Sequence, residues 1–336
     1  MNRAINVVLS RDPFLTAHSC CYVDDIVLFA STPQILLEVL RAAFKVLRET
    51  GFTLNNSKTD ILPEKVAWCG HILSAEGVTV NTEKLCHMLD IQTPKNKKEL
   101  KRILGGCQYF ANFLPGYHHD VSTLLELLKT TAKYRWTLRH EEALNRIKES
   151  LKNVPTLAFP DEDKMAGPMV LTCDASTVAV AGFLSQYTRD RQKEVLLGCF
   201  GRSLRPNERN WAINELELLS VIIGLQKYRH LLIGRNVIIR SDSKMVKFVK
   251  QMKITPSARH CRWLLNLSPL IDVETTTFDF ISGKNNLLAD YLSRKSYPPR
   301  GRYFTGGKRS DRRRINCRTF PAVGRIRSCN GGIQTR

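Results

Sequence analysis

Two aspartates stand side by side in an apolar run near the start of the chain, in CCYVDDIVLFAS at residues 20–31. The apolar flanks predict two short strands with Asp24 and Asp25 at the turn between them. Adjacent carboxylates repel each other, which raises one pKa unless a cation neutralises the pair. Magnesium held by carboxylates and substrate phosphates is usual in phosphoryl transfer. The alternative is a solvated hairpin turn, where aspartate is common, but the apolar flanks favour a metal site.

Four further carboxylates lie far apart in the second half of the chain. Asp174 ends a predicted strand in LTCDAS, and Asp242 ends another in NVIIRSD. Glu217 and Asp290 lie on predicted helices, in ELELLSVI and NNLLADYLSR. Strand ends and helix faces can meet at one edge of an α/β sheet, where sites usually form. Each carboxylate taken alone could instead be a turn residue, a helix cap or an exposed charge.

Glu215 competes with Glu217 for the helical position. Residues two apart on a helix point about 200° away from each other, so only one of the two can face a site. The neighbouring apolar residues do not decide between them.

The predicted helices and strands around the carboxylates differ between the first and the second half of the chain. Residues 32–51 predict a helix with Thr32 as its cap, Pro33 in its first turn and Gly51 at its end. Its expected apolar stripe is Leu36, Leu37, Leu40, Ala43, Phe44 and Leu47. Two strands are expected around a turn at Ala75–Gly77, and residues 81–128 are expected to be helical.

Residues 129–168 read as a linker with one amphipathic helix. From residue 169 three strands follow one another, then a helix from about Asn207 to Leu232, and then alternating strands and helices. The order predicts an α/β (α+β) fold with one central mixed sheet.

The amino-acid composition limits the classes of function that the chain can have. The chain has 336 residues, of which 43% are hydrophobic, and a formal net charge of +20 that favours nucleic acid as a partner. Its ten cysteines include no CxxC, so neither a zinc ribbon nor a thioredoxin-like redox site is indicated, and we expect reduced thiols in an intracellular, cytoplasmic protein. No run is long enough for a membrane span. His118 and His119 have no partner at metal-ligand spacing and predict a surface loop.

The tail at residues 295–336 has twelve basic residues, one acidic residue and no apolar periodicity, so we expect it to be disordered. It could be a nucleic-acid arm, a nuclear-import signal around KRSDRRR, or sequence without a selected function.

These motifs resemble the reverse transcriptase of LTR retrotransposons of the Ty3/gypsy type. YVDDIVLFAS resembles its palm hairpin, VAWCGHILSAEGV its primer-holding hairpin and LGGCQYFANFLPGY its thumb helix. The resemblance implies that Asp24 and Asp25 bind metal and that Lys58, in LNNSKTD, lies near the incoming triphosphate. It extends over residues 1–294, from an N-terminally truncated palm to the end of a second domain.

The second domain resembles the ribonuclease H that follows reverse transcriptase in that family. The resemblance implies that Asp174, Glu217, Asp242 and Asp290 hold two Mg²⁺ (or Mn²⁺) ions and that the substrate is the RNA strand of an RNA–DNA hybrid. It favours Glu217 over Glu215, through the ELLS run. Gly182 and Gln186 in AGFLSQ also match.

The implied division is a partial palm (1–80), a thumb (81–128), a connection (129–168), a ribonuclease H-like domain (169–294) and the basic tail (295–336). RNA and DNA are the expected partners, and the place of action is the cytoplasm, a retroelement particle or the nucleus.

One feature of the family pattern has no counterpart. The family has a third metal-binding aspartate on an earlier strand, but only 23 residues precede Asp24. Asp12, next to a proline, reads as a loop residue. We therefore expect weak or no polymerisation by this chain alone. The alternative function is that of a non-catalytic nucleic-acid-binding remnant of a retroelement.

Overall fold

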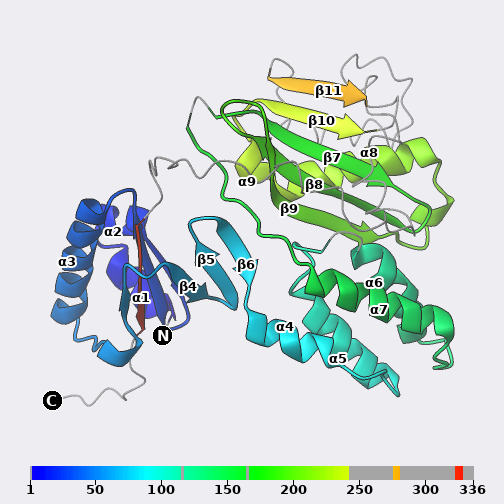
Figure 1. Ribbon diagram of the computed structural model, residues 1–336, viewed down its shortest axis with the longest axis horizontal. Helices are drawn as coiled ribbons and strands as arrows, with labels where there is room; N and C mark the ends of the chain where they lie inside the picture. The colour runs from blue at the N-terminus through cyan, green and yellow to red at the C-terminus, as the bar shows by residue number, and fades with distance from the viewer. Residues whose placement is uncertain (1, 115–116, 164–165, 242–274, 281–321, 328–336) are drawn as a thin grey trace, which may run out of the picture. The chain divides into compact units, whose positions relative to one another are not determined.

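The computed structural model describes residues 2–114, 117–163, 166–241, 275–280 and 322–327 (Figure 1). The chain divides into two compact units, residues 1–81 together with 305–336, and residues 82–304. No helix in the described ranges combines the length and apolarity that a membrane crossing requires.

The first unit contains a four-stranded sheet, a three-stranded sheet and the helices packed on them. Its elements in chain order are α1 (Asn2–Leu9), α2 (Pro13–His18), β1 (Ser19–Tyr22), β2 (Asp25–Ala30), α3 (Pro33–Glu49), η1 (Asn56–Lys58), β3 (Asp60–Ile61), β4 (Lys65–Trp68), β5 (His71–Ser74), β6 (Gly77–Val80) and β12 (Ala322–Arg327).

Helix α3 confirms the predicted helix and its ends. The Thr32 hydroxyl accepts a hydrogen bond from the Ile35 amide at 3.3 Å, and Gly51 follows the helix with a φ of +75°. The predicted apolar stripe was wrong at Leu37, which is 48% exposed, whereas Val39 is fully buried. Leu37 is one position, about 100°, past the buried Leu36, so it lies outside the core-facing stripe.

The predicted strands around Ala75–Gly77 are confirmed as β5 and β6, with Ser74 paired to Gly77. A further strand, β4, pairs with β5 and makes this a three-stranded antiparallel sheet.

The predicted disorder of the tail was wrong for residues 322–327. They form β12, which pairs antiparallel with both β2 and β3. The strand order is therefore β1-β2-β12-β3. Since a sheet edge offers a row of backbone donors and acceptors, a short extended segment can pair there without a strong sequence pattern of its own.

The second unit places a group of helices before a five-stranded sheet. Its elements are α4 (Thr82–Leu89), α5 (Lys97–Gln108), α6 (Tyr117–Leu125), η2 (Glu126–Leu128), α7 (Leu138–Lys152), β7 (Met169–Ala175), β8 (Ala179–Tyr187), β9 (Glu194–Ser203), η3 (Glu208–Asn210), α8 (Ile213–Lys227), α9 (Arg229–Leu232), β10 (Val237–Ser241) and β11 (Thr276–Phe280).

The five strands have the order β11-β10-β7-β8-β9. β7, β8 and β9 are antiparallel neighbours, whereas β10 runs parallel to β7 and β11, so the sheet is mixed as predicted. α8 packs on one face of the sheet (Figure 1). The single helix expected from Asn207 to Leu232 is instead η3, α8 and α9, because α8 begins with its own cap at Ala212.

The core between α8 and the sheet depends on two glycines. The ring of Phe200 is 2% exposed. A Cβ atom at Gly182 would lie 2.6 Å from that ring and 2.2 Å from the Thr172 carbonyl oxygen, and one at Gly224 would also lie 2.6 Å from the ring. Glycine at both positions therefore makes room for Phe200.

Gly182→Ala is expected to lower the free energy of unfolding of the second unit by about 2 kcal/mol or more, because the clash with backbone cannot relax cheaply. Calorimetric melting of the full chain measures the change. Gly105→Ala on α5 is the control, since a Cβ there meets nothing within 4 Å. That variant should be stabilised by about 0.5–1 kcal/mol. Equal melting of the two variants would contradict the packing argument.

Candidate active site

The Asp24–Asp25 hairpin (residues 19–30) is present as predicted. β1 and β2 pair antiparallel with Tyr22 opposite Asp25, so the turn consists of Val23 and Asp24. Both aspartates are half-buried. Val23 has a φ of +59°, a conformation that β-branched residues rarely adopt. Strain of this kind costs about 1–3 kcal/mol and persists where surrounding structure enforces it, often at functional sites.

The first unit holds this hairpin through one face of β2. Ile26, Leu28 and Ala30 are buried in a core with α3, and they alternate with Asp25, Val27 and Phe29. The strand period of two therefore directs Asp25 away from that core.

The other residues considered near the hairpin have separate positions. Asp12 is the N-cap of α2 and accepts a hydrogen bond from the Phe14 amide at 2.8 Å, in line with the predicted loop role. Lys58 lies at the end of η1 and is exposed. Its role towards a triphosphate stays a prediction.

Asp174 and Glu217 lie on two elements that pack together, the end of β7 and the first half of α8. Ala175 and Leu216, each next to one of these acids in sequence, belong to the same buried cluster. Cys173 and Ser220 are joined by a side-chain hydrogen bond. We call this region, where the neighbours of both acids touch, the acidic corner.

Burial distinguishes the two acids of the acidic corner. Asp174 is 1% exposed within the fully buried strand β7, and Glu217 is half-buried on α8. Burial, followed by the charge of Asp174, raises the pKa of the Cys173 thiol, so this cysteine stays protonated beside the acid.

Glu215 has a different role from Glu217. Its carboxylate Oε2 accepts a hydrogen bond from the Ala212 amide at 3.2 Å at the start of α8. A glutamate at the third helical position that bonds back to the N-cap is a capping interaction. Glu215 therefore takes part in capping the start of the helix, whereas the site role of Glu217 stays a prediction.

Asp242 and Asp290 lie outside the described residues. The strand leading to Asp242, β10, runs parallel to β7 with Arg240 opposite Thr172. It therefore ends beside the part of β7 that carries Asp174. Within the described ranges, no group of three or more His, Cys, Asp or Glu residues forms a metal site.

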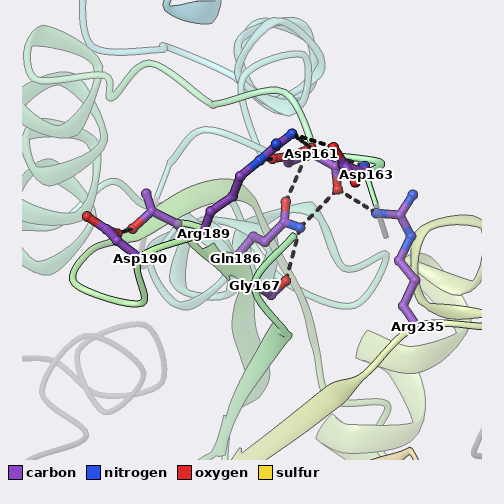
Figure 2. A network of polar contacts seen from close by, with 8 residues as sticks. Asp161, Asp163, Gly167, Gln186, Arg189, Asp190 and Arg235 are labelled. Carbon is purple, nitrogen blue, oxygen red and sulfur yellow. Dashed lines mark hydrogen bonds and ion pairs between the residues drawn. The ribbon is translucent and has the colours of Figure 1, made fainter. Parts of the chain in front are cut away.

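A polar network anchors the segment before β7 (Figure 2). The Gln186 side chain is 2% exposed, accepts from the Asp161 amide at 2.8 Å and donates to the Asp161 and Gly167 carbonyl oxygens at 3.0 and 3.2 Å. Arg235, shortly before β10, donates to the Asp161 carbonyl oxygen at 2.9 Å. The network thus ties together the segments that lead into β7 and β10.

Arg189, in the turn after β8, also bonds to this network. It donates to both carboxylate oxygens of Asp161, at 2.8 and 3.2 Å, and pairs with Asp163 at 3.0 Å. The hydrogen bond from Arg189 holds the pKa of Asp161 below its usual range. Sequence reasoning singled out Gln186 only by resemblance and missed Asp161, Arg189 and Arg235.

A second buried contact supports the loop before α8. Glu208 is 4% exposed. Its carboxylate accepts hydrogen bonds from both terminal nitrogens of Arg202, at 2.6 and 2.8 Å, and from the Arg205 amide at 2.8 Å. Burial acts to raise the pKa of Glu208, but these donors and the arginine charges outweigh it, so the pKa lies below its usual range.

The prediction that His118 and His119 form a surface loop was wrong. Both lie on α6, which packs against α7 and β9, and His119 is 5% exposed. Burial, and then the nearby charge of Lys227, lower the pKa of His118 to about 4. Both histidines are packing residues of this helix.

Two family models match the chain. Residues 1–73 match the model described as reverse transcriptase (RNA-dependent DNA polymerase). Residues 136–239 match the model described as an RNase H-like domain found in reverse transcriptase. The chain therefore matches both domains of the reverse transcriptase/ribonuclease H enzymes, one near its start and one in its second half.

Its curated relatives are Pol polyproteins of transposons. The chain is 30% identical over 293 residues to the retrovirus-related Pol polyprotein from transposon 297 of Drosophila melanogaster, covering 87% of this chain and 26% of the relative. It is 27% identical to the transposon Tf2-3 polyprotein of Schizosaccharomyces pombe, covering 86% of this chain and 21% of the relative. The chain thus spans about a quarter of these relatives and corresponds to part of a retrotransposon Pol polyprotein.

Solved structures agree on the fold. The foamy viral protease-reverse transcriptase in complex with dsDNA matches with a TM-score of 0.66 and 23% identity, over 84% of this chain and 57% of that one. The same protein in complex with an RNA/DNA hybrid matches with a TM-score of 0.65 and 22% identity, over 93% of this chain and 40% of that one.

Proposed function

We propose that residues 169–294 cleave the RNA strand of RNA–DNA hybrids in a metal-dependent reaction. The observation that carries the proposal is the acidic corner, where contacts between their neighbours bring Asp174 and Glu217 onto adjoining elements. The end of β10 beside this corner supports Asp242 as a third member, and Asp290 as the fourth comes from the family resemblance.

The residue types fit a hard divalent cation, since Mg²⁺ and Mn²⁺ prefer carboxylate oxygens. Asp174, Glu217, Asp242 and Asp290 would hold two ions. When bound, such a pair activates a water and stabilises the leaving oxygen of a phosphodiester. The chain itself fixes Asp174 by the pairing of β7 with β8 and β10 and fixes Glu217 by the packing of α8.

A labelled RNA–DNA hybrid incubated with the full chain and Mg²⁺ tests this function. The chain should cleave the RNA strand, and the Asp242→Asn variant should not. Equal cleavage by both proteins, or by neither, would count against an active nuclease. Hybrid binding without cleavage by the unaltered chain would instead support the non-catalytic remnant.

The Asp24–Asp25 hairpin is proposed as part of a polymerase metal site, with Lys58 near the triphosphate. The strained turn at Val23 supports a functional origin for this hairpin. Between residues 2 and 23, Asp12 is the only carboxylate in the chain, and it caps α2. We therefore propose that primer extension by these residues alone is weak or absent.

Nucleic acid is proposed to lie against the exposed face of α5. Lys98, Lys101 and Arg102 are exposed on this helix, while Leu100, Ile103 and Leu104 are buried on its other side. Gly105 follows Arg102 on the same helix, and a Cβ atom added there would meet nothing within 4 Å. A basic helix face with a small residue in it suits close approach of a phosphate backbone.

Replacing Lys98, Lys101 and Arg102 together with glutamine should weaken hybrid binding about tenfold or more and reduce the slope of log affinity against log salt by about 3. Fluorescence anisotropy at several salt concentrations measures both quantities.

The matched control replaces Arg41, Lys45 and Arg48, three exposed residues on one face of α3, with glutamine. It makes the same change in net charge and should leave the slope unaltered. If the two triple variants behave alike, net charge rather than the α5 face governs binding.

We also propose that the chain comes from a retrotransposon of the Ty3/gypsy type. Its similarity to transposon polyproteins supports this proposal. The proposed place of action is inside the cell, in the cytoplasm, a retroelement particle or the nucleus, where RNA–DNA hybrids occur.

A further inference from the structure

Ser220 joins the two elements of the acidic corner through its side chain. Its hydroxyl donates a hydrogen bond to the Glu217 carbonyl oxygen at 2.7 Å, one turn earlier on α8. That bond uses the proton of the hydroxyl, so the protonated Cys173 thiol is the donor in the side-chain hydrogen bond between Cys173 and Ser220. One oxygen atom therefore connects the neighbour of Asp174 on β7 with the backbone of Glu217 on α8.

Packing alone does not account for a serine at this position. Within the described helix α8 eight residues are buried, and Ser220 is the one among them with a polar side chain. Ser220 is 0% exposed. A buried hydroxyl costs free energy unless it is hydrogen-bonded, and serine forms helices less readily than alanine does. An alanine would fit the same space, so the hydroxyl itself needs an explanation.

We propose that Ser220 is a positioning residue for the divalent metal ions of the proposed nuclease site. Its two hydrogen bonds fix the end of β7 against the turn of α8 that carries Glu217. They thereby set the spacing between the carboxylates of Asp174 and Glu217. Groups that orient metal ligands without touching the metal change metal affinity by about 10–100-fold. This inference rests on the proposed function of residues 169–294.

Ser220→Ala is expected to weaken Mn²⁺ binding at the nuclease site about tenfold, because the turn that carries Glu217 loses its bond to β7. Titrations of the full chain, with free Mn²⁺ followed by EPR spectroscopy, measure this affinity. The binding that disappears in Asp174→Asn defines the nuclease site. The melting temperature of Ser220→Ala should change by no more than about 3 °C, since the variant loses one hydroxyl and gains helix propensity.

The matched control is Ser122→Ala on helix α6. Ser122 is 3% exposed, and its hydroxyl donates to the carbonyl oxygen of His119, three residues earlier, also at 2.7 Å. This variant should keep the Mn²⁺ affinity of the unaltered chain.

A second comparison isolates the hydroxyl at position 220. Ser220→Thr and Ser220→Val introduce side chains of nearly the same shape, of which only the threonine has a hydroxyl. The threonine variant should bind Mn²⁺ about tenfold more tightly than the valine variant, because it alone can keep the two hydrogen bonds.

The results that would overturn this inference differ in what they say about the nuclease. If the unaltered chain cleaves a hybrid but Ser220→Ala binds Mn²⁺ equally well, Ser220 has no positioning role and the proposed function stands. Equal losses of affinity in Ser220→Ala and Ser122→Ala, or equal affinity of the threonine and valine variants, would also remove that role. If the unaltered chain has no Mn²⁺ site that Asp174→Asn abolishes, the proposed function fails together with the inference.

Discussion

Asp174→Asn is expected to lower the rate of metal-dependent hybrid cleavage by about 100-fold or more, because a neutral amide is a much poorer ligand for a divalent cation than a carboxylate. Asparagine has nearly the same size as aspartate, and Asp174 is held in a fully buried strand. The fold should therefore persist while the charge is lost.

Initial cleavage rates with Mg²⁺, measured on a labelled hybrid, give the size of this effect. Asp90→Asn is the matched control, since it makes the same change at an exposed residue of the same unit and should keep the full rate. A thermal shift on adding Mg²⁺ should occur in the unaltered chain and disappear in Asp174→Asn. Retention of both the rate and the shift would remove Asp174 from the site.

Glu208→Ala is expected to lower the free energy of unfolding of the second unit by about 3 kcal/mol, because it leaves a partly buried arginine without its carboxylate. The Glu208 side chain is 5% exposed and that of Arg202 is 31% exposed. Glu162→Ala is the control, since Glu162 pairs with Arg235 at 3.6 Å with 76% of its side chain exposed. An exposed pair of that kind contributes about 0–1 kcal/mol.

The pH dependence gives a second test of the same contact. The pKa of Glu208 is lower in the folded chain than in the unfolded one, so its contribution is fully present above the unfolded value, about 4.3. It is lost as the pH falls through the folded value. The difference in stability between the unaltered chain and Glu208→Gln should therefore shrink below about pH 4, and a difference that stays constant to pH 2 would contradict the ion pair.

Local signals explain which parts of the fold could be predicted from the sequence. The ends of α3 follow from Thr32, Pro33 and Gly51, whose effects act within a turn of the helix. The hairpin at Asp24–Asp25 and the three strands from residue 169 follow from apolar runs and turn residues.

Other features depend on residues that meet only in the folded chain. The bonds from Gln186 to Asp161 and Gly167 join segments far apart in sequence, and no periodicity indicates them. The pairing of β12 with β2 joins the two ends of the chain. Burial of His118 and His119 comes from packing of α6 against the sheet, which sequence spacing does not encode.

Some features of the candidate site could likewise be predicted from local sequence signals, and others could not. Strand and helix patterns predicted where Asp174 and Glu217 lie along the chain. The preference for Glu217 over Glu215 came from resemblance, although the capping signal was readable, since a glutamate at the third helical position often bonds the N-cap amide. The buried Glu208–Arg202 pair carried no local signal, because its burial depends on the surrounding sheet and loop.

The most direct test of the account is a crystal structure of the full chain grown with Mn²⁺ and an RNA–DNA hybrid. Anomalous manganese density coordinated by Asp174 and Glu217 is expected, with Asp242 and Asp290 on the same ions. Carboxylates of Asp174 and Glu217 that lie apart, with manganese bound elsewhere or absent, would contradict it.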